Sequence, residues 1–473
     1  MLMFPPLSGA LALTVLAALV SLPTRAAERA PNILLIVADD LGYGELSCQG
    51  YTSQVPTPQI DSIAKNGVRF TSGYVSGPYC SLTRAGLMTG RYQQRFGHEL
   101  NPGPAHLTPP NVGLPTSEKT IGDRLKAAGY VTGWIGKSHL GYAPQFHPLK
   151  RGFDEFFGFL GGKHDFLDVD AEPTDPILRG TERIRSLDYL TDAFGRETSA
   201  FMAKHKGRPW LCYLAFNAVH APLQATEKYL ERFKHIDDPK RRSYVALQSA
   251  MDDAVGVVLA RLRELRLEED TLIFFLSDNG GPTPSTTSSN GPLRGFKSQT
   301  WEGGIRVPFM IQWKGRLPAG KVDDRPVIQL DILPTALAAA GIAVQPVWKL
   351  DGVNLLPFLT GKNTGAPHEA LYWRFGPQLA LRMGDWKILK APGAGVDPEK
   401  PRDGKATTAG VHLYHLRQDR GETENLAAER PEKVRELVAV WEKLNREMID
   451  PLWRDGAAER GTAGKAEKKA GQD

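Results

Sequence analysis

Short, continuous apolar runs that alternate with helical patterns are the feature that most constrains how this chain can fold. Residues 33–38 (ILLIVA), 210–216 (WLCYLAF) and 272–276 (LIFFL) are uninterrupted, as expected for strands buried on both faces of a parallel sheet. Further strands are expected at 131–135 and 307–313, and helices at 58–66, 117–128, 244–265 and 330–340. The pattern therefore predicts an α/β fold with a large, mostly parallel sheet and helices on both faces.

The pattern changes towards the C-terminus and divides the chain into domains. Residues 31–345 carry the alternating strands and helices and are expected to form the N-terminal domain. Residues 346–455 predict a smaller C-terminal α+β subdomain, with an antiparallel sheet within 371–390 and a packing helix over 431–448. Residues 456–473 consist largely of Ala, Gly, Lys and Glu without periodicity, which predicts a disordered tail.

The N-terminal residues have the pattern of an export signal. An apolar run over residues 11–22 is followed by small residues at Ala26 and Ala27, which predicts a cleaved signal peptide over 1–27. The run is short for a membrane span, and no other stretch is long and apolar enough, so no stable membrane span is expected. The chain is therefore expected to be exported and periplasmic or extracellular, or lysosomal in a eukaryote. Because no Lys or Arg precedes the run, a membrane anchor or a misassigned start codon is the alternative.

Charge and cysteine content limit the possible partners. The 58 Lys and Arg against 53 Asp and Glu leave a net charge of +5, too mild to predict nucleic-acid binding but compatible with anionic substrates. Three cysteines, Cys48, Cys80 and Cys212, cannot form a disulfide framework. In an oxidising compartment at least one of them must be free, paired between chains or chemically changed.

Acidic side chains follow two of the apolar runs at their carboxyl ends. Asp39 and Asp40 come directly after the first run, and Asp278 and Asn279 follow the last one closely. An open α/β sheet places its ligand site beyond these strand ends, and three carboxylates brought together there would repel one another unless a cation joined them. A single Asp after a strand is more often a turn or helix cap, but two clusters together favour a metal site. The oxygen-only donor set favours Ca²⁺ or Mg²⁺ over zinc.

A cysteine stands where a short helix is expected to begin. Residues 77–91 predict a loop that leads into a helix ended by Gly90. Cys80 at the helix start would face backbone N–H groups and the positive end of the helix dipole, which suits a nucleophile that must hold an anion. Arg84 lies one turn further on and is expected on the same face. A lone cysteine in such a position is more often a small buried apolar residue.

Several motifs in order resemble those of the type I sulfatases, the group that includes arylsulfatases and lysosomal glycosaminoglycan sulfatases. The motifs lie at residues 38–44, 80–91, 129–141, 277–281, 293–308 and 419–427, and the resemblance spans 32–448. The branch of arylsulfatase A and N-acetylgalactosamine-6-sulfatase is the most similar one. The resemblance implies an alkaline-phosphatase-like fold and a sulfuric ester hydrolase that acts on sulfated carbohydrates or aryl sulfates.

The resemblance also implies the nucleophile and the metal. In that family a maturation enzyme oxidises the motif cysteine, here Cys80, to formylglycine, and the hydrated aldehyde attacks sulfur. The bound ion would be Ca²⁺, with Mg²⁺ as the alternative. Its implied ligands, besides the formylglycine at Cys80, are Asp39, Asp40, Asp278 and Asn279.

Five further side chains have roles implied by the resemblance. Lys137 would bind both the hydrated formylglycine and the sulfate, and His139 would take a proton from the second hydroxyl. His220 would face the bridging oxygen and Lys297 would bind sulfate, and either of them would protonate the leaving alcohol. Arg84 would hold the formylglycine and offset the developing charge.

Departures from the family pattern keep two other functions open. Leu82 stands where the maturation signal has proline or alanine, Thr83 where serine is commoner, and Ser138 where an aromatic residue is usual. Because proline helps to hold this segment extended for the maturation enzyme, Leu82 leaves open a chain in which Cys80 stays a thiol and binds sulfated glycans without turnover. The other alternative is a phosphomonoester or phosphonate hydrolase of the same superfamily. The sequence does not indicate the sulfated substrate or the oligomeric state.

Overall fold

A ten-stranded sheet forms the centre of the molecule. The structure is a computed structural model that describes residues 1–2, 29–52, 54–391 and 404–453. The strand order is β11-β2-β10-β9-β1-β8-β4-β5-β6-β7. Its five central parallel strands are β9 (Thr271–Ser277), β1 (Asn32–Ala38), β8 (Trp210–Ala215), β4 (Val131–Lys137) and β5 (Glu155–Phe159). The predicted mostly parallel sheet is confirmed.

The edges of the sheet depart from the parallel pattern. β10 (Phe309–Gln312) runs antiparallel to both β9 and β2 (Val68–Phe70). The strand predicted at 307–313 is therefore present but reversed, because the connection from β9 contains only two short helices and no long crossover helix that would return the chain to the far end. The remaining edge strands are β11 (Lys321–Asp323), β6 (Leu178–Arg179) and β7 (Glu182–Arg183).

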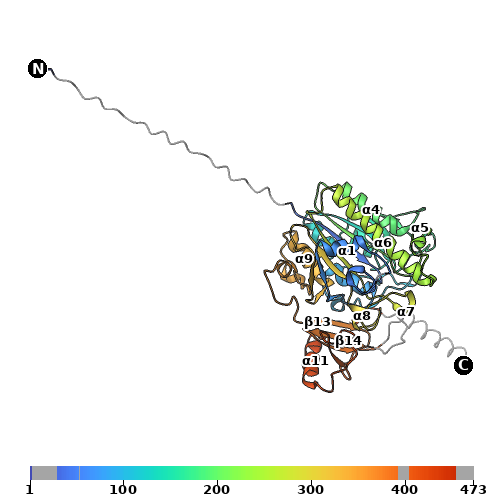
Figure 1. The fold of residues 1–473 in the computed structure, drawn as a ribbon, viewed down its shortest axis with the longest axis vertical. Coiled ribbons are helices and arrows are strands. Elements are labelled where there is room, and N and C mark those ends of the chain that lie inside the picture. The colour runs from blue at the N-terminus through green and yellow to red at the C-terminus, as the bar shows by residue number, and fades with distance from the viewer. Residues whose placement is uncertain (3–28, 53, 392–403, 454–473) are drawn as a thin grey trace.

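Helices cover both faces of the sheet, as predicted. Alternate residues of β1 enter two different apolar cores, because successive side chains of a strand point to opposite faces. The first core joins the sheet to α1 (Pro58–Lys65), α4 (Leu190–Lys204) and α6 (Pro239–Glu264). The second core joins it to α2 (Cys80–Thr89), α3 (Ile121–Ala127) and α9 (Ile332–Ala339). Figure 1 shows α4 and α6 on one side of the sheet and α9 on the other.

Two predicted helix starts were wrong, and side-chain caps explain both. α3 begins at Ile121 instead of residue 117, because Thr120 and Asp123 form a capping box that fixes the first turn. α6 begins at Pro239, before the predicted residue 244, with the Asp238 carboxylate accepting a hydrogen bond from the backbone N–H of Lys240. The polar first turn of α6 lacks the apolar spacing on which the prediction depended.

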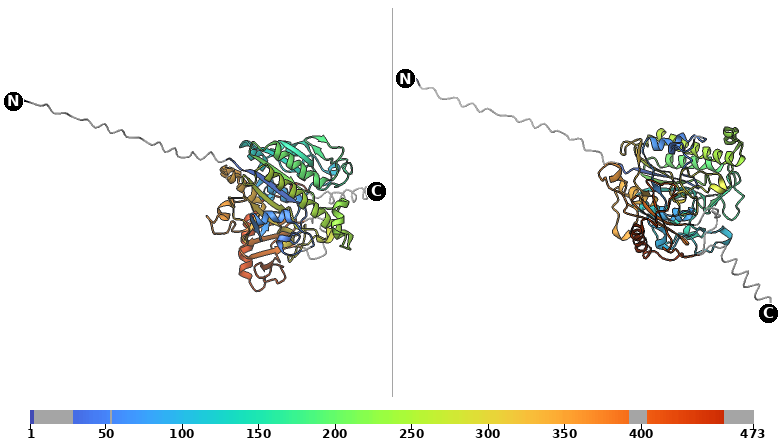
Figure 2. Two further views of the ribbon diagram at one scale, coloured as in Figure 1. Left: turned by 45° about the horizontal axis from the view of Figure 1, so that its top comes forward. Right: turned by 60° about the horizontal axis from the view of Figure 1, so that its bottom comes forward.

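A second, antiparallel sheet lies against one end of the main sheet (Figures 1 and 2). Its strands are β13 (Leu371–Phe375), β14 (Gln378–Met383), β15 (Trp386–Lys390) and β16 (His412–His415), and α11 (Pro431–Asn445) packs on them. This confirms the predicted antiparallel sheet and helix, whereas the boundary at 345 stays a prediction. The shorter elements are β3 (Gly73–Tyr74), β12 (Val327–Ile328), α5 (Glu227–Leu230), α7 (Thr283–Thr286), α8 (Glu302–Ile305) and α10 (Leu356–Leu359).

Some predictions fall on parts of the chain that are not described. Residues 3–27 of the predicted signal peptide and the predicted tail at 456–473 lie outside the described residues. Within the described ranges, no helix has both the length and the apolar character needed to cross a bilayer.

The close approach of β4 to β8 predicts a large difference between two glycine substitutions. Gly136 has φ +112, and an added Cβ would lie 1.9 Å from the carbonyl oxygen of Ala215, whereas Gly129 has φ +89 and open space around it. Gly136→Ala should lower the free energy of unfolding by about 3 kcal/mol or more, from strain plus overlap. Gly129→Ala, the matched control, should cost about 1–2 kcal/mol from strain alone. If urea denaturation showed the same loss of unfolding free energy for both variants, the close contact between β4 and β8 would not be the cause of the larger predicted cost at Gly136.

Candidate active site

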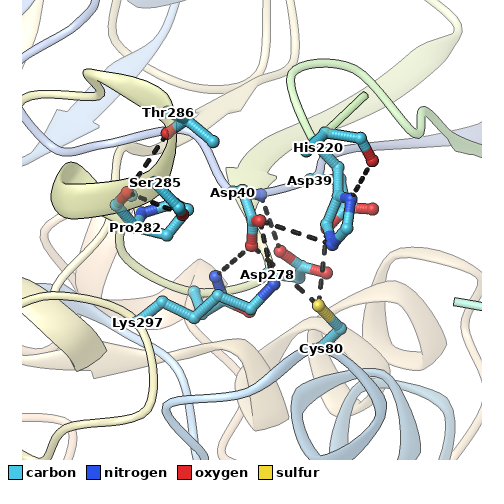
Figure 3. A network of polar contacts seen from close by, with 12 residues as sticks. Asp39, Asp40, Cys80, His220, Asp278, Pro282, Ser285, Thr286 and Lys297 are labelled. Atoms are coloured by element: carbon cyan, nitrogen blue, oxygen red, sulfur yellow. Dashed lines mark hydrogen bonds and ion pairs between the residues drawn. The ribbon is translucent and has the colours of Figure 1, made fainter. Parts of the chain in front are cut away.

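The pairing of β1 with β9 brings the two predicted acidic clusters together. Ala38 and Ser277 are partners in the parallel ladder, so the residues that follow them emerge at the same edge. The backbone N–H of Asp40 donates to Asp278 Oδ1 (3.1 Å), and Asn279 Nδ2 donates to Asp40 Oδ1 (2.7 Å). Asp39, Asp40, Asp278 and Asn279 are all buried. Figure 3 shows the three aspartates facing the Cys80 sulfur.

Cys80 is the first residue of α2 and points at these carboxylates. The helix ends before Gly90, which has a left-handed backbone with φ 66, so the predicted helix is confirmed at both ends. Cys80 Sγ lies 3.5 Å from Asp39 Oδ1 and 4.0 Å from Asp40 Oδ1, and the residue is only 1% exposed. Burial, together with the nearby Asp278, raises the pKa of the Cys80 thiol well above its ordinary value, so the unmodified thiol is a poor nucleophile here.

Each of the three aspartates is paired with a cation. Arg84 donates to Asp278 Oδ2 through Nε (3.0 Å) and Nη2 (2.8 Å). Lys137 Nζ lies 2.5 Å from Asp39 Oδ2, and Lys297 Nζ lies 2.8 Å from Asp40 Oδ2. Arg84, one turn into α2, thus meets Lys137 and Lys297 at the three aspartates, although the two lysines are far apart in the sequence.

The two neighbouring carboxylates differ in how easily they ionise. Burial and the charge of Asp278 raise the pKa of Asp39 to about 7, in spite of the ion pair with Lys137. Burial also opposes ionisation of Asp40, but Lys297 outweighs it and lowers the pKa of Asp40 to about 2. An additional cation would therefore stabilise the ionised form of Asp39 more than that of Asp40.

Two histidines complete the cluster, and both are held neutral. His220 Nε2 lies 3.6 Å from Asp40 Oδ2, while its Nδ1 lies 2.6 Å from the carbonyl oxygen of Ala221. Burial, with Lys297 nearby, lowers the pKa of His220 to about 3. His139 has a left-handed backbone (φ 59), and burial followed by the charge of Lys137 lowers its pKa well below the ordinary value. Both rings are therefore neutral at neutral pH.

The donor atoms at this site fit a hard divalent cation. Ligand atoms of Asp39, Asp40, Cys80 and His220 lie within 4.8 Å of one another. The side-chain oxygen of Asn279 is buried and has no hydrogen-bond partner among the described residues, which is costly unless a further group satisfies it. Asp278 is joined to the same cluster through Asp40. A set dominated by carboxylate and amide oxygens matches the preference of Ca²⁺ and Mg²⁺.

Several residues around the site were not predicted. The Tyr213 hydroxyl on β8 accepts a hydrogen bond from Arg84 Nη1 (3.3 Å). Ser81 Oγ donates to the carbonyl oxygen of His139 (2.6 Å) and lies 2.5 Å from His98 Nε2. The hydroxyl of Tyr213 within an otherwise apolar run could have signalled a buried polar contact, whereas no spacing rule relates His98 to the other residues.

The three residues that depart from the family pattern, Leu82, Thr83 and Ser138, are all buried. Leu82 packs in a small apolar cluster with Tyr79 and Phe375, the last residue of β13. Ser138, next to Lys137, is fully buried, and its hydroxyl has no hydrogen-bond partner in the described part of the chain. Leu82 therefore links the helix that carries Cys80 to the antiparallel sheet.

Comparison with known proteins agrees with this site. The family profile described as Sulfatase matches residues 31–342, which is more than half of the chain. The chain belongs to the sulfatase family. The N-acetylgalactosamine-6-sulfatase of Canis lupus familiaris is 34% identical to this sulfatase over 434 residues, covering 84% of this chain and 81% of that protein. The steryl-sulfatase of Homo sapiens is 31% identical over 435 residues, covering 74% and 73%.

Solved structures show the same architecture. Ps i-CgsB, solved in complex with k-i-k-neocarrahexaose, aligns with this sulfatase with a TM-score of 0.83 at 34% identity, covering 91% of this chain and 96% of the other. The PsFucS1 sulfatase from Pseudoalteromonas sp. aligns with a TM-score of 0.75 at 25% identity, covering 90% and 92%. The fold implied by the sequence motifs is thereby confirmed.

Burial of His98 predicts how acid destabilises this sulfatase. Burial lowers the pKa of His98 from 6.5 to about 3, so between these values the unfolded chain binds a proton that the folded chain does not. Stability contributed in this way is present above pH 6.5 and is lost as the pH falls towards 3. The loss from this one group reaches about 1 kcal/mol per pH unit.

Urea denaturation of His98→Gln between pH 7 and pH 4 tests this prediction. Glutamine can still donate to Ser81 but does not titrate, so the slope of the unfolding free energy against pH should be flatter than in the wild type. His106→Gln, at an exposed histidine, is the control and should keep the wild-type slope. A wild-type slope in His98→Gln would contradict the assignment.

Proposed function

We propose that this sulfatase removes sulfate from a sulfated carbohydrate, and also from aryl sulfates, with formylglycine formed from Cys80 as the nucleophile. The observation that carries the proposal is the position of Cys80, which begins a helix, lies 3.5 Å from Asp39 and is surrounded by three cations. The similarity to an N-acetylgalactosamine-6-sulfatase and to Ps i-CgsB supports a carbohydrate substrate.

Conversion of Cys80 to formylglycine would explain why the site is built around a thiol that is itself a poor nucleophile. The raised pKa of the thiol keeps it protonated, and Arg84 lies one helical turn away, where it can stabilise an oxygen anion but does little for a neutral thiol. A formylglycine-generating maturation enzyme is therefore the partner that the proposal requires. Leu82 is buried after folding, so its effect on maturation concerns the unfolded chain.

The proposed metal is Ca²⁺, with Mg²⁺ as the alternative. When bound, the ion would polarise the sulfate and lower the pKa of the attacking hydroxyl. The crowded carboxylates and the unpartnered Asn279 oxygen support this donor set. The residues proposed to hold it are Asp39, Asp40, Asp278, Asn279 and the modified Cys80.

Lys137, the last residue of β4, and His139, two residues further on, are proposed to hold the nucleophile and to accept its proton. Lys137 Nζ, fully buried and charged, would hold the hydrated formylglycine and one sulfate oxygen. His139 is neutral and would accept the proton of the second hydroxyl when sulfate leaves. The hydrogen bond from Ser81 to the His139 carbonyl would fix this histidine relative to the nucleophile.

Lys297 is proposed as the acid that protonates the leaving alcohol, with His220 facing the bridging oxygen, where its Nε2 would accept a hydrogen bond from the alcohol once that oxygen is protonated. The proton of neutral His220 sits on Nδ1, which faces the Ala221 carbonyl, so the Nε2 that faces the site has no proton to give. Although burial opposes its charge, Asp40 raises the pKa of Lys297 above its ordinary value and keeps it protonated.

All proposed site residues fall between positions 39 and 297, inside the proposed catalytic domain at 31–345. The proposed signal peptide at 1–27 implies that the protein is exported to the periplasm, the extracellular space or, in a eukaryote, the lysosome. A sulfated polysaccharide would be encountered in any of these places.

The first test is the mass of the tryptic peptide at residues 70–84, from protein made in its native host, combined with rate measurements. The peptide should show the mass loss that accompanies conversion of thiol to aldehyde. The same preparation should release sulfate from an aryl sulfate at least 100-fold faster than phosphate from the matching aryl phosphate. Cys80→Ala should lose at least 10³-fold in kcat/KM, as removal of a covalent nucleophile does.

Other outcomes of this test would replace the proposal. Faster release of phosphate would indicate the phosphomonoesterase alternative. An intact thiol with no turnover would indicate a protein that only binds sulfated glycans.

Calcium binding is tested by stability as well as activity. Adding Ca²⁺ to chelator-treated protein should raise the free energy of unfolding, by about 2.7 kcal/mol at 100 times the dissociation constant. Asp40→Asn should lose this response, and asparagine tolerates the left-handed backbone at that position (φ 62). Asp252→Asn, a buried aspartate outside the site, is the control and should keep the full response. An identical melting temperature with and without Ca²⁺ in the wild type would contradict the metal assignment.

A further inference from the structure

Lys297 belongs to an irregular loop whose backbone is strained next to the lysine. The loop connects β9 to β10 and precedes α8. Ser298 has φ 69, a left-handed conformation that residues other than glycine, asparagine and aspartate rarely adopt. Such a conformation persists only where neighbouring groups fix the backbone. Lys297 itself has a long, flexible side chain, so the direction of its ammonium group depends on how this backbone is held.

The two backbone polar groups of Ser298 are fixed from opposite sides. Its N–H donates to the carbonyl oxygen of Pro78 (2.7 Å), in the segment that leads to Cys80. Its carbonyl oxygen accepts a hydrogen bond from Gln378 Nε2 (2.8 Å). Gln378 is the first residue of β14, and its amide oxygen also accepts the backbone N–H of Thr300 (3.0 Å). One buried amide thus holds the loop on the C-terminal side of Lys297 at two points.

A buried ion cluster holds the next part of the same loop. Lys387, on β15, donates to the carbonyl oxygen of Thr300 (3.0 Å) and pairs with Glu302 (2.9 Å) and Glu422 (2.8 Å). Glu422 also accepts the backbone N–H of Glu302 at 2.7 Å. All three ionic side chains are fully buried, so breaking one of these ion pairs would leave an uncompensated charge in the interior, which opposes movement of the loop.

The motif at 419–427 reaches the other end of the loop as well. Glu422 belongs to this motif, and its backbone carbonyl oxygen accepts a hydrogen bond from Arg294 Nη1 (2.9 Å). Contacts from the C-terminal part of the chain therefore fix residues on both sides of Lys297. Within the described part of the chain, Gln378, Lys387 and Glu422 make no hydrogen bond or ion pair with the aspartates or Cys80, so their effect on the site passes through the loop.

We infer that Gln378, supported by the Lys387–Glu302–Glu422 cluster, is a positioning residue that sets where Lys297 meets the sulfate group. The inference rests on the proposed function, in which Lys297 contacts sulfate and the leaving alcohol. It gives the antiparallel sheet a role in catalysis, and it gives the 419–427 motif a physical function. A displacement of about 1 Å at a reacting group can cost about 100-fold in rate. Loss of the Gln378 amide should therefore lower the rate of sulfate release, although Gln378 does not touch the reacting groups.

The test compares three variants of the full-length, formylglycine-containing protein. Gln378→Met keeps the length of the side chain and removes both hydrogen bonds, and Gln378→Glu keeps the acceptor for Thr300 but loses the donor to Ser298. Tyr372→Phe is the matched control: Tyr372 lies on β13 of the same sheet, and the variant removes its hydrogen bond to Asn445 of α11 (2.7 Å), which does not involve the loop. Formylglycine content and melting temperature are measured for each variant. These values separate a loss of maturation or of folding from a change in the position of Lys297.

The expected results distinguish positioning from general stabilisation. Gln378→Met should lower kcat/KM for an aryl sulfate by 10- to 100-fold, Gln378→Glu should also lower it, and Tyr372→Phe should leave it within twofold of wild type. In a Lys297→Ala background, Gln378→Met should add less than threefold, because the residue through which it acts is gone. Losses that multiply in the double variant, or more than half of the activity retained in Gln378→Met, would overturn the inference.

A readout that does not need turnover separates this inference from the proposed function. Acetic anhydride should acetylate Lys297 at least tenfold faster in Gln378→Met than in wild type or Tyr372→Phe, as measured by peptide mass. If converted wild-type protein hydrolyses no sulfate ester, the proposed function fails, and the labelling rate still decides the positioning role. An unchanged labelling rate in Gln378→Met overturns the positioning role whatever the activity.

Discussion

The structure depends most on one arrangement, three buried carboxylates brought to the same edge of a sheet by the parallel pairing of β1 and β9. Asp39, Asp40 and Asp278 would repel one another in a low-dielectric interior, so the fold must supply opposite charge at short range. It does so with one cation for each, from a helix start, a strand end and a distant loop. Much of the surrounding architecture can be understood as the support that keeps these cations in place.

That support comes from unexpectedly distant parts of the chain. Arg84 is reached by a hydroxyl from β8, and the Lys297 loop is held by side chains of the antiparallel sheet. Leu82 and Phe375 join the same sheet to the helix that begins with Cys80. The antiparallel sheet therefore packs against the segment that carries Cys80 and against the loop that carries Lys297, so its packing affects the geometry of the site.

The sequence was sufficient to predict the parallel core and the acidic cluster, because buried strands leave uninterrupted apolar runs and parallel strands end together. The roles of Lys137, His139, His220 and Lys297 came from family motifs. The structure shows Lys137, His220 and Lys297 next to Asp39 and Asp40, and His139 close enough to Lys137 for the charge of the lysine to affect its pKa. The reversed direction of β10 and the early start of α6 were missed, because apolar periodicity carries no strand direction and no polar cap. Contacts such as His98 with Ser81 or Gln378 with Ser298 join residues whose association no local pattern encodes.

The burial of Cys80 has a consequence for the order of events in the life of the protein. Only 1% of the Cys80 surface is accessible in the folded chain. A modifying enzyme that needs an extended peptide cannot reach it once the sheet has closed. If Cys80 is converted as proposed, folding and maturation compete for the same segment, and a chain that folds first would have the native structure but lack the proposed nucleophile.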